Sequence, residues 1–509
     1  MTDALTRGRG LDDLIATVRN SRARLVDAWE ATALIESLGY TDTRVGAEFG
    51  FPDTMTLGTY VFDRLSRDVR ASGAAGAEPP RHLLVDFANS AGSTLVYAIP
   101  WLIAFIAESI NPDILRLPGH TGPSLSIALM LSLIVSGGFI QAISRRGQFY
   151  VGMRQPKLAA LVCGYLFRLG AAVTVAIAVA GVATGWYFGL FSWPYLLLAA
   201  DQFIILSLLW MTCAMLAVRH EYWRQPIAFG AGAIAFIALR AAGRDALLAE
   251  IIASAVVLAA AFVQVPLVFA SESHEQLAEV PLPRMTVVLY RVLPFFWYGT
   301  AYFCFLFADR FAASASVAAL TGAPFGLRAT YKLGMDIALL TFLFASAGVE
   351  YANIRFTRWI KTESRAPYIS DRNQFGRALG RHHLWMLALV VGVFLPTAAV
   401  VAVLVKWLLP AEPASVWTMA ALGDLGYLLF ALALLNMLVL FSLNRPWMAV
   451  KSLTAGLAAN IGVGFVLSHA VNTSFATTGL IVGAALVAAL STIAVRRTLR
   501  RADYALAAA

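Results

Sequence analysis

The sequence predicts an all-α, polytopic membrane protein. Two observations on composition lead to this fold class: hydrophobic residues make up 59% of the chain and charged residues only 14%, and the mean hydropathy is +0.71. So few polar side chains do not cover the surface of a water-soluble domain. The third observation is a set of twelve long apolar runs. All but the fifth exceed the roughly 20 residues that a helix needs to cross about 30 Å of hydrocarbon.

Residues 1–80 precede these runs and differ from them in composition. Apolar positions recur at helical spacing in 11–38 and again in 42–69, where Pro52 interrupts the pattern. Ala, Gly and Pro are frequent in 71–80, which is typical of a flexible tether. We expect 1–80 to form a small cytoplasmic helical appendage. Two interpretations of its role stay open: docking of a partner and contact with the bilayer surface.

The apolar runs divide into two predicted six-helix membrane halves, 81–271 and 285–496. The polar segment 272–284 separates the halves as a cytoplasmic linker, and 497–509 forms a cytoplasmic tail. Several superfamilies of transporters are built from two such halves. The fifth of the predicted spans is the shortest. The spans cover 83–110, 121–144, 158–188, 192–218, 226–241, 246–271, 285–309, 331–352, 384–409, 416–442, 447–469 and 474–495.

The distribution of Lys and Arg among the connections predicts the orientation in the membrane. The even-numbered connections hold most of these residues, and the odd-numbered ones hold few. Because basic connections stay in the cytoplasm, we expect both termini on the cytoplasmic side of a bacterial inner membrane, without a removable signal peptide. The formal net charge of +9 therefore reflects topology and contact with anionic lipid, not nucleic-acid binding.

Ionisable residues at membrane depth are the first candidates for a functional site, since inserting one costs about 2.5–3.5 kcal/mol on insertion scales. Arg168 and Arg291 lie near the middle of apolar runs. We expect both to face the interior between the two halves. Acidic residues in or near the spans are candidates for coupling to an ion gradient: Asp86, Asp201, Asp336 and Glu350.

The first predicted span of each half contains one proline near its middle: Pro100 in the first half and Pro294 in the second. A proline lacks the backbone donor and bends a helix at this point. Bent helices in corresponding positions favour a gating role. A static kink filled by neighbouring side chains is the other interpretation.

Charged residues around the seventh connection predict a binding site for an anion. Asp309 and Arg310 end the seventh span, and Arg328 and Lys332 open the eighth. Guanidinium groups removed from water bind phosphate and carboxylate in a bidentate way, so a basic cluster at a cavity mouth favours an anionic or uronic substrate. The aromatic side chains of 295–305 suit stacking on a sugar ring, or else form a lipid-facing belt.

The sequence contains no motif of an enzyme. It has no P-loop, no H-E-x-x-H pattern and no recognisable Ser/His/Asp arrangement. Cys163, Cys213 and Cys304 lie within apolar spans, where a thiol is more often a packing residue than a metal ligand or disulfide partner. We expect no catalytic residue, no metal and no cofactor.

Three short segments carry a resemblance to a known group of proteins. They are 297–310 (WYGTAYFCFLFADR), 346–359 (SAGVEYANIRFTRW) and 499–504 (LRRADY). With twelve spans and a bent seventh helix, the chain resembles the multidrug/oligosaccharidyl-lipid/polysaccharide exporter (MOP) superfamily. Within it, the chain is most similar to the polytopic membrane subunit of the Pel exopolysaccharide secretion machinery. The resemblance covers chiefly the second half and marks Asp309, Arg310 and Glu350 as site residues.

The resemblance implies a membrane exporter or flippase, not an enzyme, that moves a polysaccharide or lipid-linked glycan across the inner membrane by alternating access. Its energy would come from an ion gradient or from a cytoplasmic glycosyltransferase. Two alternatives stay open. An ion-coupled exporter of small amphipathic molecules predicts acidic residues around the cavity. An integral-membrane glycosyl- or acyltransferase predicts acidic or His residues that converge on one face.

The eighth connection has more basic residues than topology requires. Near an anionic leaflet each such residue contributes about 1 kcal/mol to surface binding. The same residues also suit an acidic protein partner. We expect either a lipid-bound segment or, together with 1–80, a docking site for a cytoplasmic glycosyltransferase and other secretion-complex subunits. The basic residues are Arg355, Arg358, Lys361, Arg365, Arg372, Arg377 and Arg381.

Overall fold

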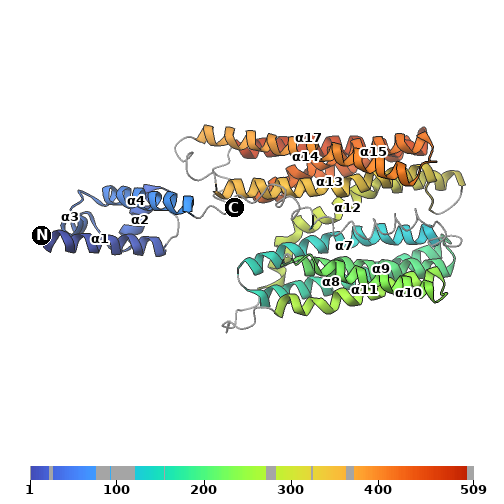
Figure 1. Ribbon diagram of the computed structural model, residues 1–509, viewed down its shortest axis with the longest axis horizontal. Coiled ribbons are helices and arrows are strands. Elements are labelled where there is room, and N and C mark those ends of the chain that lie inside the picture. The colour runs from blue at the N-terminus through green and yellow to red at the C-terminus, as the bar shows by residue number, and fades with distance from the viewer. Residues whose placement is uncertain are drawn as a thin grey trace. The chain divides into compact units, whose positions relative to one another are not determined.

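The computed structural model describes residues 2–21, 27–75, 92, 121–153, 155–219, 221–270, 283–321, 325–362 and 372–500. All regular secondary structure in these residues is helical (Figure 1), which confirms the all-α fold class. The chain forms two compact units, Met1–Val85 and Asp86–Ala509.

The N-terminal unit is a small helical domain with its own apolar core. Its helices are α1 (Thr2–Ser21), α2 (Ala28–Ser37), α3 (Asp42–Phe49) and α4 (Thr54–Ala75). α3 ends at Gly50, whose φ of +77° suits glycine, and Pro52 lies in the turn that follows. The interruption expected at Pro52 is therefore confirmed. The core consists of Leu14, Ile15, Val18, Ile35, Val45, Leu57, Val61 and Leu65.

Two aspartates tie the start of α4 to the rest of this unit. Asp42 Oδ1 accepts hydrogen bonds from Thr54 N at 2.8 Å and Thr54 Oγ1 at 2.7 Å, and these bonds lower the pKa of Asp42. Asp53 Oδ1 accepts from Thr56 N and Oγ1, both at 2.6 Å, which lowers the pKa of Asp53. Both carboxylates thus bind backbone N–H groups that no helical carbonyl satisfies.

We expect the start of α4 to lose hydrogen-exchange protection as the pH falls below about 4. A folded-state pKa below the unfolded value stabilises the fold above the unfolded pKa, and this stabilisation disappears as the pH falls through the folded pKa. The measurement is amide exchange of Thr54 in the full chain, corrected for the intrinsic rate. Asp42→Asn should flatten the pH dependence, whereas Asp12→Asn, on the exposed face of α1, should preserve it. Equal curves for both variants would contradict the prediction.

The first helical bundle of the membrane unit consists of α7 (Thr121–Gly152), α8 (Pro156–Tyr187), α9 (Trp193–Ala217), α10 (Arg224–Ala241) and α11 (Ala246–Ala270). α8 and α9 each begin with a proline in the first turn, where the missing N–H has no helical partner to lose. Glycine residues let the helices of this bundle pack closely. A Cβ at Gly170 of α8 would stand 3.0 Å from the Phe139 ring of α7. The core of this bundle includes Phe139, Ile143, Val162, Cys163, Leu166 and Met211.

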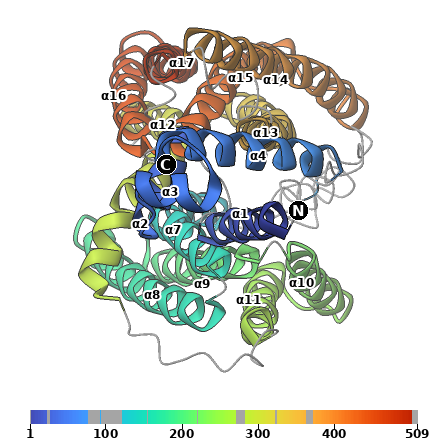
Figure 2. The same ribbon diagram turned by 90° about the vertical axis from the view of Figure 1, so that its left-hand side faces the viewer.

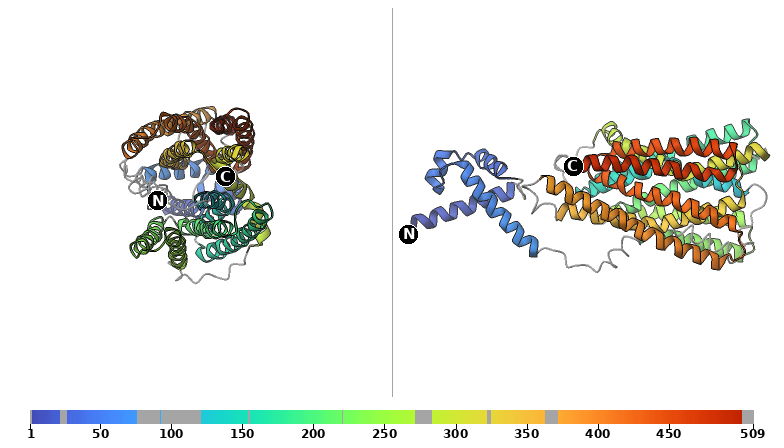
Figure 3. Two further views of the ribbon diagram at one scale, coloured as in Figure 1. Left: turned by 90° about the vertical axis from the view of Figure 1, so that its right-hand side faces the viewer. Right: turned by 90° about the horizontal axis from the view of Figure 1, so that it is seen from above.

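The second bundle consists of α12 (Met285–Thr321), α13 (Ala329–Thr362), α14 (Arg372–Leu408), α15 (Ala414–Ser442), α16 (Pro446–Ala470), the short helix η2 (Thr473–Phe475) and α17 (Ala476–Leu499). Seen end-on, the two bundles form separate groups of helices, with α12 passing between them (Figure 2). Within the membrane unit the long helices run alongside one another (Figure 3). The core of the second bundle includes Phe305, Phe342, Phe356, Phe394, Tyr427 and Phe430.

Hydrogen bonds made by polar side chains join the helices of the second bundle. His383 Nε2 lies 2.8 Å from Asn436 Oδ1, and Asn436 Nδ2 donates to Ser491 Oγ at 3.1 Å and to Thr492 Oγ1 at 2.9 Å. Asn460 Nδ2 donates to the Phe305 carbonyl at 3.0 Å. These contacts join α14 to α15 and α17, and α16 to α12. In an apolar bundle, such bonds specify which helices become neighbours.

Ten of the described helices are long and apolar enough to cross a membrane: α7, α8, α9 and α11 to α17, η2 being included with α17. They correspond to ten of the twelve predicted spans. The fifth predicted span is helix α10, but Arg224, Gln225 and Arg240 leave its apolar stretch too short for this class. The first predicted span, 83–110, lies outside the described residues except for residue 92, and so do Asp86 and Pro100.

Candidate functional site

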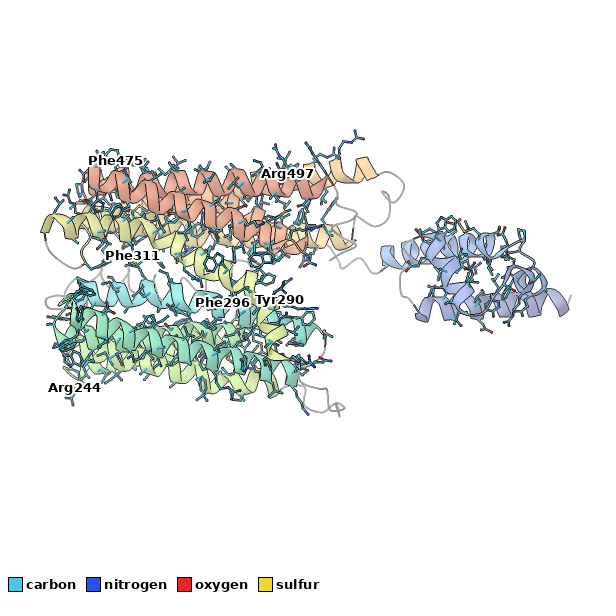
Figure 4. All side chains as sticks on the ribbon, turned by 180° about the vertical axis from the view of Figure 1, so that it is seen from behind. Arg244, Tyr290, Phe296, Phe311, Phe475 and Arg497 are labelled. Atoms are coloured by element: carbon cyan, nitrogen blue, oxygen red, sulfur yellow. The ribbon has the colours of Figure 1, made fainter. Side chains whose placement is uncertain are left out.

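The two bundles meet where α7 crosses α12. A Cβ at Gly137 of α7 would stand 2.7 Å from the carbonyl oxygen of Gly299 in α12, and a Cβ at Gly299 would overlap the Gly137 carbonyl. A Cβ at Gly138 would stand 2.7 Å from the ring of Phe296, which Figure 4 places on α12 beside the first bundle. With no side chain between them, the two backbones touch directly.

Three arginines lie toward the end of this crossing where α7 ends and α12 begins. The guanidinium of Arg145 on α7 stacks over the Phe295 ring of α12, 5.0 Å from its centroid. Arg291 lies four residues before Phe295, so it shares that face of α12 one turn away. It is an electrostatic neighbour of Arg146. The junction between the bundles is therefore strongly basic at this end. We refer to Arg145, Arg146 and Arg291 as the basic junction.

A second charged cluster lies inside the second bundle. Asp309 and Arg310 are consecutive residues of α12, and their side chains are 0% and 5% exposed. Asp336 of α13 is 31% exposed and accepts a hydrogen bond from Arg310 Nη2 at 3.0 Å. We call Asp309, Arg310 and Asp336 the ionic centre.

Two tyrosines and two carbonyls complete the polar shell of the ionic centre. Tyr331 Oη donates to Asp309 Oδ2 at 2.7 Å. Arg310 Nη1 donates to Tyr427 Oη at 3.2 Å and to the Leu306 carbonyl at 3.3 Å, while Nη2 also donates to the Met335 carbonyl at 3.1 Å. The guanidinium is thus bound on several sides, which is the condition for a buried charge to persist.

One atom of the ionic centre has no hydrogen-bond partner among the described residues: Asp309 Oδ1. It lies 3.7 Å from Arg310 Nη1, an ion-pair distance that is too long for a hydrogen bond. With both carboxylates ionised, the ionic centre carries one negative charge in excess. Uptake of one proton or one monovalent cation would neutralise it, and Asp336 is its most exposed member.

The structure brings together some of the residues that the sequence suggested and separates others. Asp309, Arg310 and Asp336 meet in the ionic centre. Arg328 and Lys332 are exposed at the start of α13, and Arg328 Nη1 lies 3.5 Å from Asn472 Oδ1. The expected basic cluster at the seventh connection is therefore split into an exposed pair and a buried arginine.

The remaining candidates occupy different surroundings. Arg168 is exposed on α8 and its Nε donates to the Gly164 carbonyl of its own helix at 3.3 Å. Asp201 is exposed on α9. Glu350 is half-buried on α13 and is an electrostatic neighbour of Tyr222 and Tyr298. Pro294 lies within α12, which continues through it as one helix.

Sequence reasoning missed four residues of these clusters: Tyr331 and Tyr427 in the ionic centre, and Arg145 and Arg146 in the basic junction. A tyrosine inside an apolar run resembles a packing residue. The two arginines end a predicted span, where basic residues are expected for topology alone. The weak signal was the glycine pair 137–138 on the same helix, which indicates a close helix approach.

Comparisons with known proteins give a result at the level of structure. No protein-family model matches the chain, and no curated protein sequence matches it. A multidrug resistance MATE transporter of the MOP superfamily, in an outward-facing conformation, aligns with a TM-score of 0.58 and 12% identity over 81% of this chain and 95% of that one.

Two further structures show the same likeness. A MOP superfamily transporter from Pyrococcus furiosus aligns with a TM-score of 0.58 and 12% identity, over 81% of this chain and 95% of that one. A mutant of the Vibrio cholerae MATE transporter aligns with a TM-score of 0.52 and 14% identity, over 86% and 98%. None of these likenesses is specific to the Pel secretion subunit, so that finer resemblance stays a prediction. The chain has the fold of the MATE transporters of the MOP superfamily.

Proposed function

We propose that this chain is a multi-pass exporter of the inner membrane that works by alternating access and draws on an ion gradient. The observation that carries the proposal is the ionic centre: three ionisable groups inside an apolar bundle. Such groups are costly at membrane depth and commonly belong to ion pathways. The chain also shares its fold with proteins described as transporters.

The ionic centre suits a coupling role because its charge changes with one ion. Arg310 is bonded to Asp336 at 3.0 Å and stands 3.7 Å from Asp309. When Asp336 takes up a proton or cation, its hold on Arg310 weakens, and the guanidinium can close on Asp309. This shift moves α13 relative to α12. A local charge change of this kind biases a two-state packing of helices.

The proposed substrate is a polysaccharide or a lipid-linked glycan. The basic junction supports it, because an exporter of small amphipathic cations would need acidic residues between the bundles. One structural neighbour, the Pyrococcus furiosus transporter, is described as having a binding pocket of reversed polarity that suggests a different function. The fold therefore accommodates pockets of either polarity. Export of small amphipathic molecules is the second candidate, because another neighbour is described as a multidrug resistance transporter.

The proposal extends to topology and partners. Both termini would lie in the cytoplasm, where Arg355, Arg358, Arg377 and Arg381 of α13 and α14 could receive a cytoplasmic glycosyltransferase. The segment between these helices, 363–371, lies outside the described residues. Charge reversal at Arg377 and Arg381 should then reduce co-purification of that enzyme.

We expect Asp336→Asn to reduce gradient-driven transport at least about tenfold, which corresponds to about 1.4 kcal/mol in the barrier. The assay uses the full chain in proteoliposomes under an imposed pH or sodium gradient. One set of vesicles contains a fluorescent lipid-linked oligosaccharide, and another contains a fluorescent lipophilic cation. Movement of the glycan alone supports the first candidate, and movement of the cation alone supports the second.

The matched control is Glu412→Gln, which removes a carboxylate from the connection between α14 and α15. It should transport at the wild-type rate. If the wild-type chain moves neither probe under any gradient, the exporter proposal fails. If Asp336→Asn transports as fast as the wild type, the ionic centre is not the coupling site.

A further inference from the structure

The basic junction contains three guanidinium groups, and no described carboxylate pairs with any of them. The ion pairs in the described part of the chain join other residues: Arg44 to Glu48, Arg224 to Glu221, and Arg310 to Asp309 and Asp336. Arg145 and Arg291 are both electrostatic neighbours of Arg146, and all three have the same charge. Mutual repulsion therefore destabilises this arrangement unless an anion joins it.

Arg146 gives the clearest sign of a missing partner. Arg146 is only 9% exposed, and its Nε has no hydrogen-bond partner among the described residues. A buried, charged donor without an acceptor is destabilising. Exposed arginines at a membrane surface do not meet this problem, because water and lipid headgroups bind them. The burial of Arg146 thus separates it from an ordinary topology-setting residue.

The local packing holds these guanidinium groups in place. A Cβ at Gly147, next to Arg146, would overlap Val218 of the first bundle and stand 3.0 Å from Cys163 Sγ. The end of α7 is therefore fixed against its neighbours. Arg145 stacks over Phe295, and the Arg146 guanidinium lies 5.5 Å from the Phe149 centroid. Stacking uses the face of a guanidinium and leaves its N–H edge free for oxygen atoms.

We propose that the basic junction binds a phosphate or pyrophosphate group of the transported substrate. This group is the one that links a glycan to its lipid carrier, and a guanidinium edge matches its oxygens in a bidentate way. The inference rests on the proposed function, because it names the part of the substrate that the junction recognises. Since Arg145 and Arg146 come from α7 and Arg291 from α12, a bound anion would connect the two bundles.

The test is binding of inorganic pyrophosphate to the purified full chain in nanodiscs, followed by thermal unfolding at constant ionic strength. Pyrophosphate should raise the melting temperature of the wild-type chain in a saturable way, because a ligand of the folded state stabilises it by mass action. Arg146→Gln should abolish this shift. Its own melting temperature without ligand should be higher than the wild-type value, because an unpaired buried charge has been removed.

Two further variants keep the test decisive. Arg291→Gln changes an exposed side chain, so it folds even if Arg146→Gln does not, and it should weaken the affinity for pyrophosphate at least about tenfold. Arg240→Gln is the matched control. It removes a half-buried arginine whose Nη1 donates to the Arg244 carbonyl at the end of α10. This control should keep the wild-type shift.

The lipid composition of the nanodiscs distinguishes the two sources of phosphate. Pyrophosphate should raise the melting temperature in nanodiscs of zwitterionic lipid. The rise should have the same size in nanodiscs that contain anionic lipid. If anionic lipid replaces the effect of pyrophosphate, the junction holds a lipid headgroup and the substrate assignment is overturned. An equal pyrophosphate shift in the wild type, Arg146→Gln and Arg291→Gln overturns the site itself. Because the readout is binding, a chain that binds pyrophosphate but transports nothing would leave the site intact and remove the exporter proposal.

Discussion

Replacing Arg310 with alanine should destabilise the membrane unit by about 3–5 kcal/mol, the usual cost of removing one partner from a buried ion pair. Asp309 would then lose its neighbouring cation and keep, among the described residues, Tyr331 as its hydrogen-bond donor at 2.7 Å, fully buried beside a second carboxylate. Two negative charges without a counter-ion in an apolar bundle are far less stable than the present arrangement.

Thermal unfolding of the detergent-purified chain, followed by its own tryptophan fluorescence, measures this loss. Arg328→Ala is the matched control for stability, because it removes an exposed arginine at the start of α13 and should change the melting temperature little. The triple variant Asp309→Asn, Arg310→Met, Asp336→Asn should recover most of the stability, because neutral groups replace all three charges together. An Arg310→Ala chain as stable as Arg328→Ala would show that the ionic centre does not hold α12 and α13 together.

The fold follows from the sequence because helix length in a membrane is set by bilayer thickness. Ten of the predicted spans coincide with described helices that are long and apolar enough to cross. Among the predicted spans that the structure describes, the exception is α10, which has Arg224 and Arg240 near its two ends, so its apolar part is shorter than a span. The appendage was also predictable, because Pro52 and Gly50 mark the break between α3 and α4.

The candidate site was only partly predictable. A sequence shows how deep in the membrane a residue lies, but it does not show which neighbouring helix the side chain faces. Asp309, Arg310 and Asp336 were chosen for charge within or at the end of apolar runs. Their meeting depends on how α13 packs on α12, which local sequence does not specify. Arg328 and Lys332 were grouped with them by proximity in sequence, yet they stand at the exposed start of α13. Asp336 lies further along the same end of α13 and is less exposed than Arg328 and Lys332.

Arg146 shows the same limit in another form. In a count of basic residues it is indistinguishable from Arg145, since both follow the same apolar run. One of the two is exposed and the other is buried, and this difference depends on the rotation of α7 against its neighbours. The glycines at 137 and 138 set that rotation, because they are the positions at which α12 can approach.

We expect Gly299→Val to disrupt the joining of the two bundles. The new Cβ would overlap the Gly137 carbonyl and stand 2.7 Å from Gln141 Cγ. A side-chain obstacle can change rotamer, but a carbonyl moves only with its helix, so α7 and α12 must separate. Overpacking of an interior costs about 1–3 kcal/mol where neighbours can adjust, and this backbone contact should be at or above the upper end of that range.

Thiol labelling of Gln141→Cys detects the separation directly, in a chain whose three native cysteines have been replaced. In the Gly299 background this thiol contacts α12 and should react slowly. In the Gly299→Val background it should react at least about tenfold faster, with a parallel loss of transport. Gly392→Val is the matched control, because a Cβ at Gly392 of α14 meets nothing within 4 Å. Slow labelling that is unchanged by Gly299→Val would mean that α7 and α12 are not in backbone contact.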